Sequence, residues 1–143
     1  QEGEALKTDL LDKLERMNEN VTLIEERYPQ IVAEYRGRLE EKVKELLEDV
    51  QIDEGRIAAE VVIFSDKICT DEETVRLRSH IATMKEALIA GGSIGRKLDF
   101  IAQEMNREAN TILSKANDLV TSNVAIDLKT EIEKVREQIQ NIE

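Results

Sequence analysis

The sequence predicts an all-α protein, an extended antiparallel helical bundle with a long N-terminal helix. Only one Pro and six Gly occur in 143 residues. Hydrophobic residues make up 41% and charged residues 36%, a composition typical of long helices and coiled coils. Apolar residues also recur in steps of three and four over most of the chain. The length is suited to a single domain, and no Gly- or Ser-rich linker divides it.

The first predicted helix covers residues 1–50 and is expected to form a long helical arm. Its apolar positions, which share one helix face, are Leu6, Leu10, Leu14, Met17, Val21, Ile24, Tyr28, Ile31, Tyr35, Leu39, Val43, Leu46 and Val50. Pro29 should interrupt this helix, because proline has no amide proton for the carbonyl of Glu25. The stripe nevertheless stays in phase across Pro29. We expect one long kinked helix or two helices broken near Tyr28, and we favour the kinked helix.

Residues 51–143 are expected to form a helical bundle. Asp53 is a suitable N-cap for a short apolar helix, GRIAAEVVIFSDK, which we expect to be buried on most sides. Thr70 is expected to open a helix from about Asp71 to Ala90, with acidic residues in its first turn that suit the helix dipole. Two glycines at residues 91–92 should end that helix.

Two further helices are predicted after the glycines. Ser93 is expected to cap the first, whose apolar stripe is Leu98, Ile101 or Ala102, Met105, Ala109, Ile112, Ala116 and Leu119. The last helix should run from roughly Asn123 to Ile142. Its apolar positions are Ile126, Leu128, Ile132, Val135, Ile139 and Ile142.

Composition also restricts the class of protein. No segment is long and apolar enough to cross a bilayer, so a soluble protein without a membrane partner is expected. A single cysteine, Cys69, excludes an internal disulfide and a cysteine-based zinc site, and it favours a cytoplasmic location. The chain begins with Gln1 inside a helical pattern, and we therefore expect it to be the C-terminal part of a longer protein.

Residues 91–118 differ chemically from the Glu- and Lys-rich remainder. A polar face at helical spacing is rich in amides and arginines: Arg96, Asp99, Gln103, Asn106, Arg107, Asn110, Ser114 and Asn117. Such groups offer directional hydrogen bonds, suited to a polar network, a partner, or phosphates and bases. Because the whole chain has a net charge of −11, any site for a polyanion must be local, or must be completed by an N-terminal part or another subunit.

Two carboxylates on this helix have two interpretations. Glu104 and Glu108 are four residues apart, where like charges repel unless a cation lies nearby. That cation is either a divalent metal, Mg²⁺ or Mn²⁺, or a basic side chain such as Arg107, Lys115 or one from another helix. His80, the only histidine, is similarly either an acid or base or an ordinary polar contact.

Several motifs occur here in one order: EETVRLRSHI, GGSIGRKLDFIAQEMNREANTILSKAND and LKTEIEKVREQIQNIE. Together with the opening QEGEALKTDLLDKLE, they closely resemble the C-terminal half of the YicC/YloC family of bacterial stress-induced proteins. The resemblance covers essentially the whole chain. It implies a metal-dependent endoribonuclease that cleaves RNA, assembles into homo-oligomers and carries a further N-terminal half.

The resemblance also gives the signature positions candidate roles. Glu104, Glu108, His80 and Arg107 are the catalytic candidates. The substrate-binding candidates are Arg76, Arg96, Gln103, Asn106, Asn110 and Lys115. Glu104 and Glu108, helped by Asp99 or Glu73, would hold Mg²⁺ or Mn²⁺ that polarises the phosphate, while the basic residues neutralise charge on its oxygens. The alternative is a helical assembly module with the active site in the N-terminal half. Convergence of these side chains on an accessible cleft would favour the enzyme, whereas their dispersal or burial in an ion-pair network would favour the module.

Overall fold

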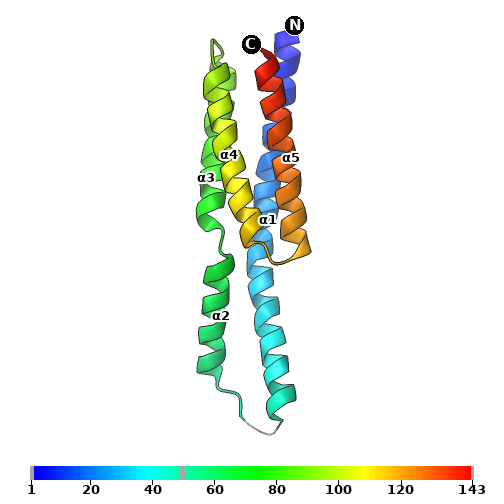
Figure 1. Cartoon of the computed structure of the whole chain (residues 1–143), viewed down its shortest axis with the longest axis vertical. Coiled ribbons are helices and arrows are strands. Elements are labelled where there is room, and N and C mark those ends of the chain that lie inside the picture. Colours follow the sequence, from blue (N-terminus) through cyan, green and yellow to red (C-terminus); the bar gives the residue numbers. More distant parts are fainter. Residues whose placement is uncertain (1, 49–50, 143) are drawn as a thin grey trace.

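The computed structural model describes residues 2–48 and 51–142 as an all-α protein, as predicted (Figure 1). Five helices account for nearly all of these residues, and no strand occurs among them. Their bounds are α1 (Glu2–Leu47), α2 (Glu54–Ile68), α3 (Asp71–Ala90), α4 (Gly95–Lys115) and α5 (Leu119–Ile142). No helix in the described ranges has both the length and the apolar character that a membrane span requires.

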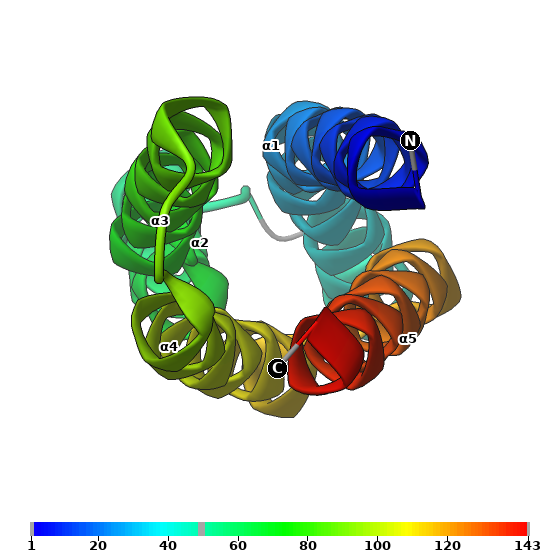
Figure 2. The same ribbon diagram turned by 90° about the horizontal axis from the view of Figure 1, so that it is seen from above.

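Four of the helices form an antiparallel bundle around one core. The first part of α1 packs between α3 and α5, and α4 closes the ring on the other side (Figure 2). Met17, Leu77, Met105 and Leu128, one residue from each helix, are completely buried. Burial of these apolar side chains is the main stabilising contribution to the bundle.

The helix α1 is continuous through Pro29 and is not divided in two. Its apolar stripe is buried in the bundle from Leu10 to Ile24, Tyr28 is half-buried, and Ile31 is buried. Beyond that point Tyr35, Leu39 and Val43 are half-buried, and Leu46 is exposed. Val50, the last predicted position of the stripe, lies outside the described residues. The predicted long helix therefore forms, but only part of it belongs to the bundle.

The second part of α1 and the whole of α2 project beyond the bundle as a two-helix arm, whose described residues are 32–48 and 51–68 (Figure 1). Tyr35 and Phe64 stack between the two helices, with ring centroids 3.8 Å apart. The prediction that α2 is buried on most sides was wrong, because α2 packs chiefly on α1 alone. Within α2, Ile57 and Ile68 are buried, whereas Ile63 is 62% exposed. The expected boundary near residue 50 therefore does not separate arm from bundle.

Several helix ends follow the predicted local signals. Asp53 caps α2, since its Oδ1 accepts from the amide of Arg56 at 3.2 Å. At the end of α3, Gly91 and Gly92 have φ angles of 73° and 86°, which favour glycine. Thr70 is the N-cap residue of α3, although its side chain makes no capping hydrogen bond.

Two predicted boundaries were wrong. The residue before α4 is Ile94 and not Ser93, and no side chain caps this helix. The helix α5 begins at Leu119, before the expected Asn123, because Asp118 accepts from the amide of Thr121 at 3.2 Å and starts the helix there. Leu119 is consequently 80% exposed and does not belong to the buried stripe. The side chain of Ile142 lies outside the described residues.

Candidate functional site

The helix α4 has an apolar side in the core and polar side chains in three other directions. Leu98, Ala102, Met105, Ala109 and Ile112 are completely buried, as the predicted stripe requires. The remaining sides of the helix face α3, α5 and the outside of the bundle. The predicted polar face is therefore divided, and each part has its own chemistry.

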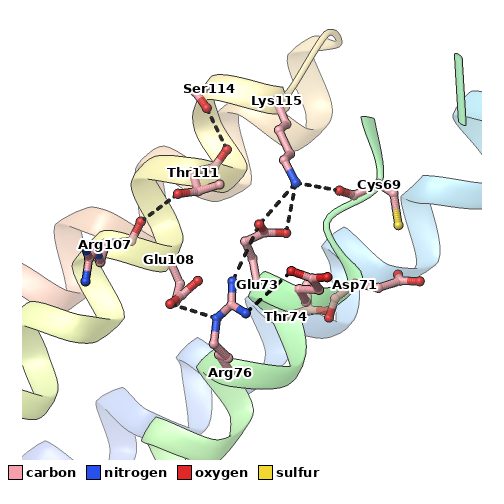
Figure 3. Close-up of polar contacts among 11 residues, drawn as sticks. Cys69, Asp71, Glu73, Thr74, Arg76, Arg107, Glu108, Thr111, Ser114 and Lys115 are labelled. Atoms are coloured by element: carbon pink, nitrogen blue, oxygen red, sulfur yellow. Dashed lines mark hydrogen bonds and ion pairs between the residues drawn. The ribbon is translucent and has the colours of Figure 1, made fainter. Parts of the chain in front are cut away.

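Glu108 faces α3 and forms an ion pair there. Its side chain is only 9% exposed, and its Oε2 lies 3.0 Å from Nε of Arg76 (Figure 3). The hydrogen bond to Glu108 raises the pKa of the Arg76 guanidinium above its ordinary value. A buried carboxylate needs such a partner, since its burial without one is costly. The interpretation that a basic residue from another helix neutralises this carboxylate is therefore supported by the geometry.

Glu73 extends this arrangement along the same interface. Its side chain is 5% exposed, and its Oε2 accepts from Nζ of Lys115 at 3.1 Å. The same ammonium donates to the carbonyl of Cys69 at 3.0 Å, where the chain passes from α2 into α3. Arg76 lies 3.8 Å from Glu73 and so connects the two carboxylates (Figure 3). We call Glu73, Arg76, Glu108 and Lys115 the ionic cluster.

Asp99 lies on another side of α4. Its Oδ1 is 3.3 Å from Nε of Arg136 on α5, and its Oδ2 accepts from Nε2 of Gln103 at 3.0 Å. Because an α-helix turns about 100° per residue, positions 99 and 108 point in opposite directions. The structure therefore does not bring Asp99 together with Glu108. Asn106 is half-buried, and its Oδ1 has no hydrogen-bond partner among the described residues.

The outward face of α4 is exposed along its length. It carries Arg96, Phe100, Gln103, Arg107, Asn110 and Ser114, all of them exposed. The side chain of Arg107 is 77% exposed, and its guanidinium lies 3.8 Å from Glu104, a long and weak ion pair. Four of the predicted site residues are therefore exposed on this face: Arg96, Gln103, Arg107 and Asn110. Two more, Arg76 and Lys115 of the ionic cluster, have partly exposed side chains.

The predicted metal ligands do not form one donor set. No three side chains of His, Cys, Asp or Glu converge in the ranges 2–48 and 51–142 in a way that could hold a metal ion. Glu73 and Glu108 accept from basic side chains, and Asp99 pairs with α5. Glu104, 29% exposed, is the most weakly held of the four carboxylates. These residues by themselves do not fit a complete site for Mg²⁺ or Mn²⁺, which prefer several oxygen ligands.

His80 lies on α3, one helical turn after Arg76, and is half-buried. It is not among the residues whose ion pairs join α3 to α4.

Two further residues contribute to the polar sides of α4, although the sequence interpretation did not consider them. Arg136 neutralises Asp99, and no local motif predicts a contact between residues so distant in the chain. Phe100 is 61% exposed within a polar face, and its position in the helical pattern could have identified it.

Comparisons with known proteins agree with the resemblance. Residues 24–143 match the family described as endoribonuclease YicC-like, C-terminal. A probable endoribonuclease YicC from Clostridioides difficile (strain 630) is 44% identical over 144 aligned residues, which cover 100% of this chain and 49% of that protein. A probable endoribonuclease YicC from Haemophilus influenzae is 34% identical over 142 residues, covering 99% of this chain and 49% of that protein.

The chain therefore spans about half the length of these curated relatives. The family match covers most of the chain and includes α3, α4, α5 and the arm. On these grounds, the chain belongs to the endoribonuclease YicC-like family and matches its C-terminal domain.

Proposed function

We propose that the full-length protein is an endoribonuclease that cleaves RNA phosphodiester bonds, and that α4 of this domain contacts the RNA. The observation that carries the proposal is the outward face of α4, where arginines and amides are exposed in a continuous row. The names of both relatives, probable endoribonuclease YicC, support the reaction class. The relative from Clostridioides difficile is about twice as long as this chain, so the proposed reaction is assigned to the full-length protein.

The composition of the row suits the backbone of RNA. A guanidinium can donate two parallel hydrogen bonds to a phosphate, and amide side chains can bond to phosphate and sugar oxygens. Arg96 and Arg107 would supply the first kind of contact, and Gln103 and Asn110 the second. Since the chain as a whole carries a net charge of −11, RNA would be attracted to this row and repelled elsewhere.

The ionic cluster would support the same surface. Arg76 and Lys115 are anchored by buried carboxylates, yet their side chains remain 48% and 35% exposed. They can therefore present part of their charge to a phosphate while staying fixed in position. In this proposal Glu108 and Glu73 are positioning residues, and they do not contact the reacting phosphate.

A divalent ion, Mg²⁺ or Mn²⁺, remains part of the proposal for the full-length protein. Of the four predicted metal ligands, Glu104 is the most available to such an ion, because its ion pair to Arg107 is long. The other ligands would come from outside the described residues, so we assign no step to the ion. His80 remains a candidate acid or base, since it is half-buried and lies one helical turn after Arg76 on α3.

A second candidate function is assembly into homo-oligomers through the arm. The arm carries Leu46, Val62 and Ile63 on its surface, with exposed fractions of 72%, 56% and 62%. Exposed apolar side chains on a projecting pair of helices offer contacts to the helices of another subunit. In this case the domain would join subunits, and the chemistry would reside in the other half of the protein.

The two candidates are tested with the full-length protein. Cleavage of an end-labelled RNA should require Mg²⁺ or Mn²⁺, stop with chelator, and fall at least tenfold in Arg107→Ala. Arg38→Ala, an exposed arginine on the arm, is the matched control and should keep full activity. Unchanged cleavage in Arg107→Ala, together with a lower oligomer mass in Ile63→Asp by light scattering, would favour the assembly function.

A further inference from the structure

Phe100 is an aromatic side chain on an otherwise polar surface. It is 61% exposed, although phenylalanine is among the residues most often buried in folded proteins. It lies on the outward face of α4, away from the apolar stripe that fills the core. Its exposure is therefore a property of its position in the helix and is not a result of incomplete packing.

The other aromatic residues of the chain are engaged within the structure. The chain contains two Tyr, two Phe and no Trp. Tyr35 and Phe64 stack on each other with an interplanar angle of 11°. The hydroxyl of Tyr28 donates to the carbonyl of Ser65 at 2.9 Å. Phe100 therefore differs from the other three, whose rings or hydroxyl groups join α2 to α1.

Two neighbours of Phe100 on the outward face are of residue types that can contact nucleic acid. Arg96 precedes it by four residues, and Gln103 follows it by three, so both lie next to the ring on the same helix face. Arg107 lies two turns further on, at about 10 Å along the axis, and Arg96 lies about 6 Å away in the other direction. Neither Arg96 nor Gln103 is buried. The ring thus lies between two cationic side chains along one line.

We propose that Phe100 stacks on an unpaired base of the bound RNA while Arg96 and Arg107 contact the phosphates on either side. This inference rests on the proposed function and adds a preference for RNA with unpaired bases. Aromatic side chains stack on bases that are splayed out of single strands or loops. The bases of a duplex are already stacked on each other and offer no free face. The domain would therefore select single-stranded RNA or loops over continuous duplex.

The test measures the affinity of the full-length protein for two labelled RNAs by fluorescence anisotropy, in chelator so that cleavage does not interfere. One RNA is unstructured, and the other is a continuous duplex of equal length. Wild type should bind the unstructured RNA more tightly. Phe100→Ala should lose about fivefold or more of that affinity, as expected for one stacked base, while its duplex affinity stays unchanged. Phe100→Trp should keep the preference, because its ring also stacks.

Ile89→Ala is the matched control, since Ile89 is 58% exposed on α3 and lies outside the proposed RNA surface. Equal affinities of wild type and Phe100→Ala for the unstructured RNA would overturn the stacking inference alone. A change of oligomer mass in Phe100→Ala would also overturn it, by showing that the ring packs against protein. Failure of the wild type to bind either RNA would overturn the RNA-binding proposal for the outward face and, with it, the stacking inference.

Discussion

The side chains of Arg76 and Glu108 meet at 3.0 Å across the interface of α3 and α4, and only the arginine is accessible to solvent. The carboxylate is 9% exposed and the guanidinium side chain 48% exposed. Loss of the arginine and loss of the carboxylate charge should therefore differ in their effect on stability. Removal of the arginine leaves a buried charge without a partner, whereas neutralisation of the carboxylate leaves a cation that water can still solvate.

This asymmetry predicts that Arg76→Ala lowers the free energy of unfolding more than Glu108→Gln does. The amide of Gln keeps the shape of Glu and can still accept a hydrogen bond from Arg76. Urea denaturation of both variants, monitored by circular dichroism, measures the difference. A double variant should lose less than the sum of the two single losses, since both remove the same interaction.

Arg107→Ala is the control for this comparison, because its guanidinium is 77% exposed and its one ion pair, to Glu104, is long. It should leave the free energy of unfolding within about 0.5 kcal/mol of wild type. Equal stability of Arg76→Ala and Glu108→Gln would contradict the asymmetry.

The pH dependence of stability should depend in part on Asp118. Burial raises the pKa of this carboxyl, but hydrogen bonds from Thr121 and Arg27 outweigh burial and hold the pKa below its ordinary value. A carboxylate whose pKa is lower in the folded state contributes stability above its unfolded pKa, about 3.9. That contribution is lost as the pH falls from about 4 through the lower pKa of the folded state.

Asp118→Asn should therefore reduce stability near pH 7, and this reduction should become smaller as the pH falls below about 4. Thermal unfolding of wild type and variant across this range would show the two midpoints approaching each other in acid. Midpoints separated by a constant interval at every pH would show that the charge of Asp118 does not contribute. Arg27 forms its own ion pair to Asp118 at 3.1 Å, so Arg27→Gln should show the same trend.

Because the arm is exposed, substitutions of an isoleucine in the arm and of one in the core should differ in their effect on the free energy of unfolding. Ile63 on α2 is 62% exposed, whereas Ile81 on α3 is 1% exposed in the core. Ile81→Ala should cost about 2–5 kcal/mol through lost burial and the resulting cavity. Ile63→Ala should change the stability of the monomer by less than about 0.5 kcal/mol. Denaturant titrations at low protein concentration measure both, and a large loss in Ile63→Ala would show that its face is covered in solution.

Much of the fold could be predicted from periodicity. A three- and four-residue apolar repeat identifies α1, α4 and α5, and Asp53 and Gly91 mark helix ends through side-chain and backbone preferences. The exposure of α2 could not be predicted in this way. Its run of apolar residues does not reveal that only α1 packs against it, because the number of covering helices is a tertiary property.

The candidate site was predicted only in part. The accessible arginines and amides of α4 follow from the helical pattern, and the structure places them on the outside. Local spacing predicted Arg107 as a partner of Glu104, but it did not predict the partners of Glu108 and Asp99. Glu104 and Glu108 are neighbours in the helix, yet Glu108 pairs with Arg76 of α3 and Asp99 pairs with Arg136 of α5. Such pairs depend on which helices are adjacent, and only the packed structure shows this.

The salt dependence of RNA binding tests most directly whether the outward face of α4 contacts the RNA backbone. Affinity of the full-length protein for unstructured RNA would be measured over a range of salt concentrations for wild type, Arg107→Ala and Arg38→Ala. Loss of one phosphate contact should weaken binding and reduce the slope of log affinity against log salt by about 0.7 in Arg107→Ala alone. Identical slopes and affinities for the three proteins would contradict the account and assign α4 a structural role.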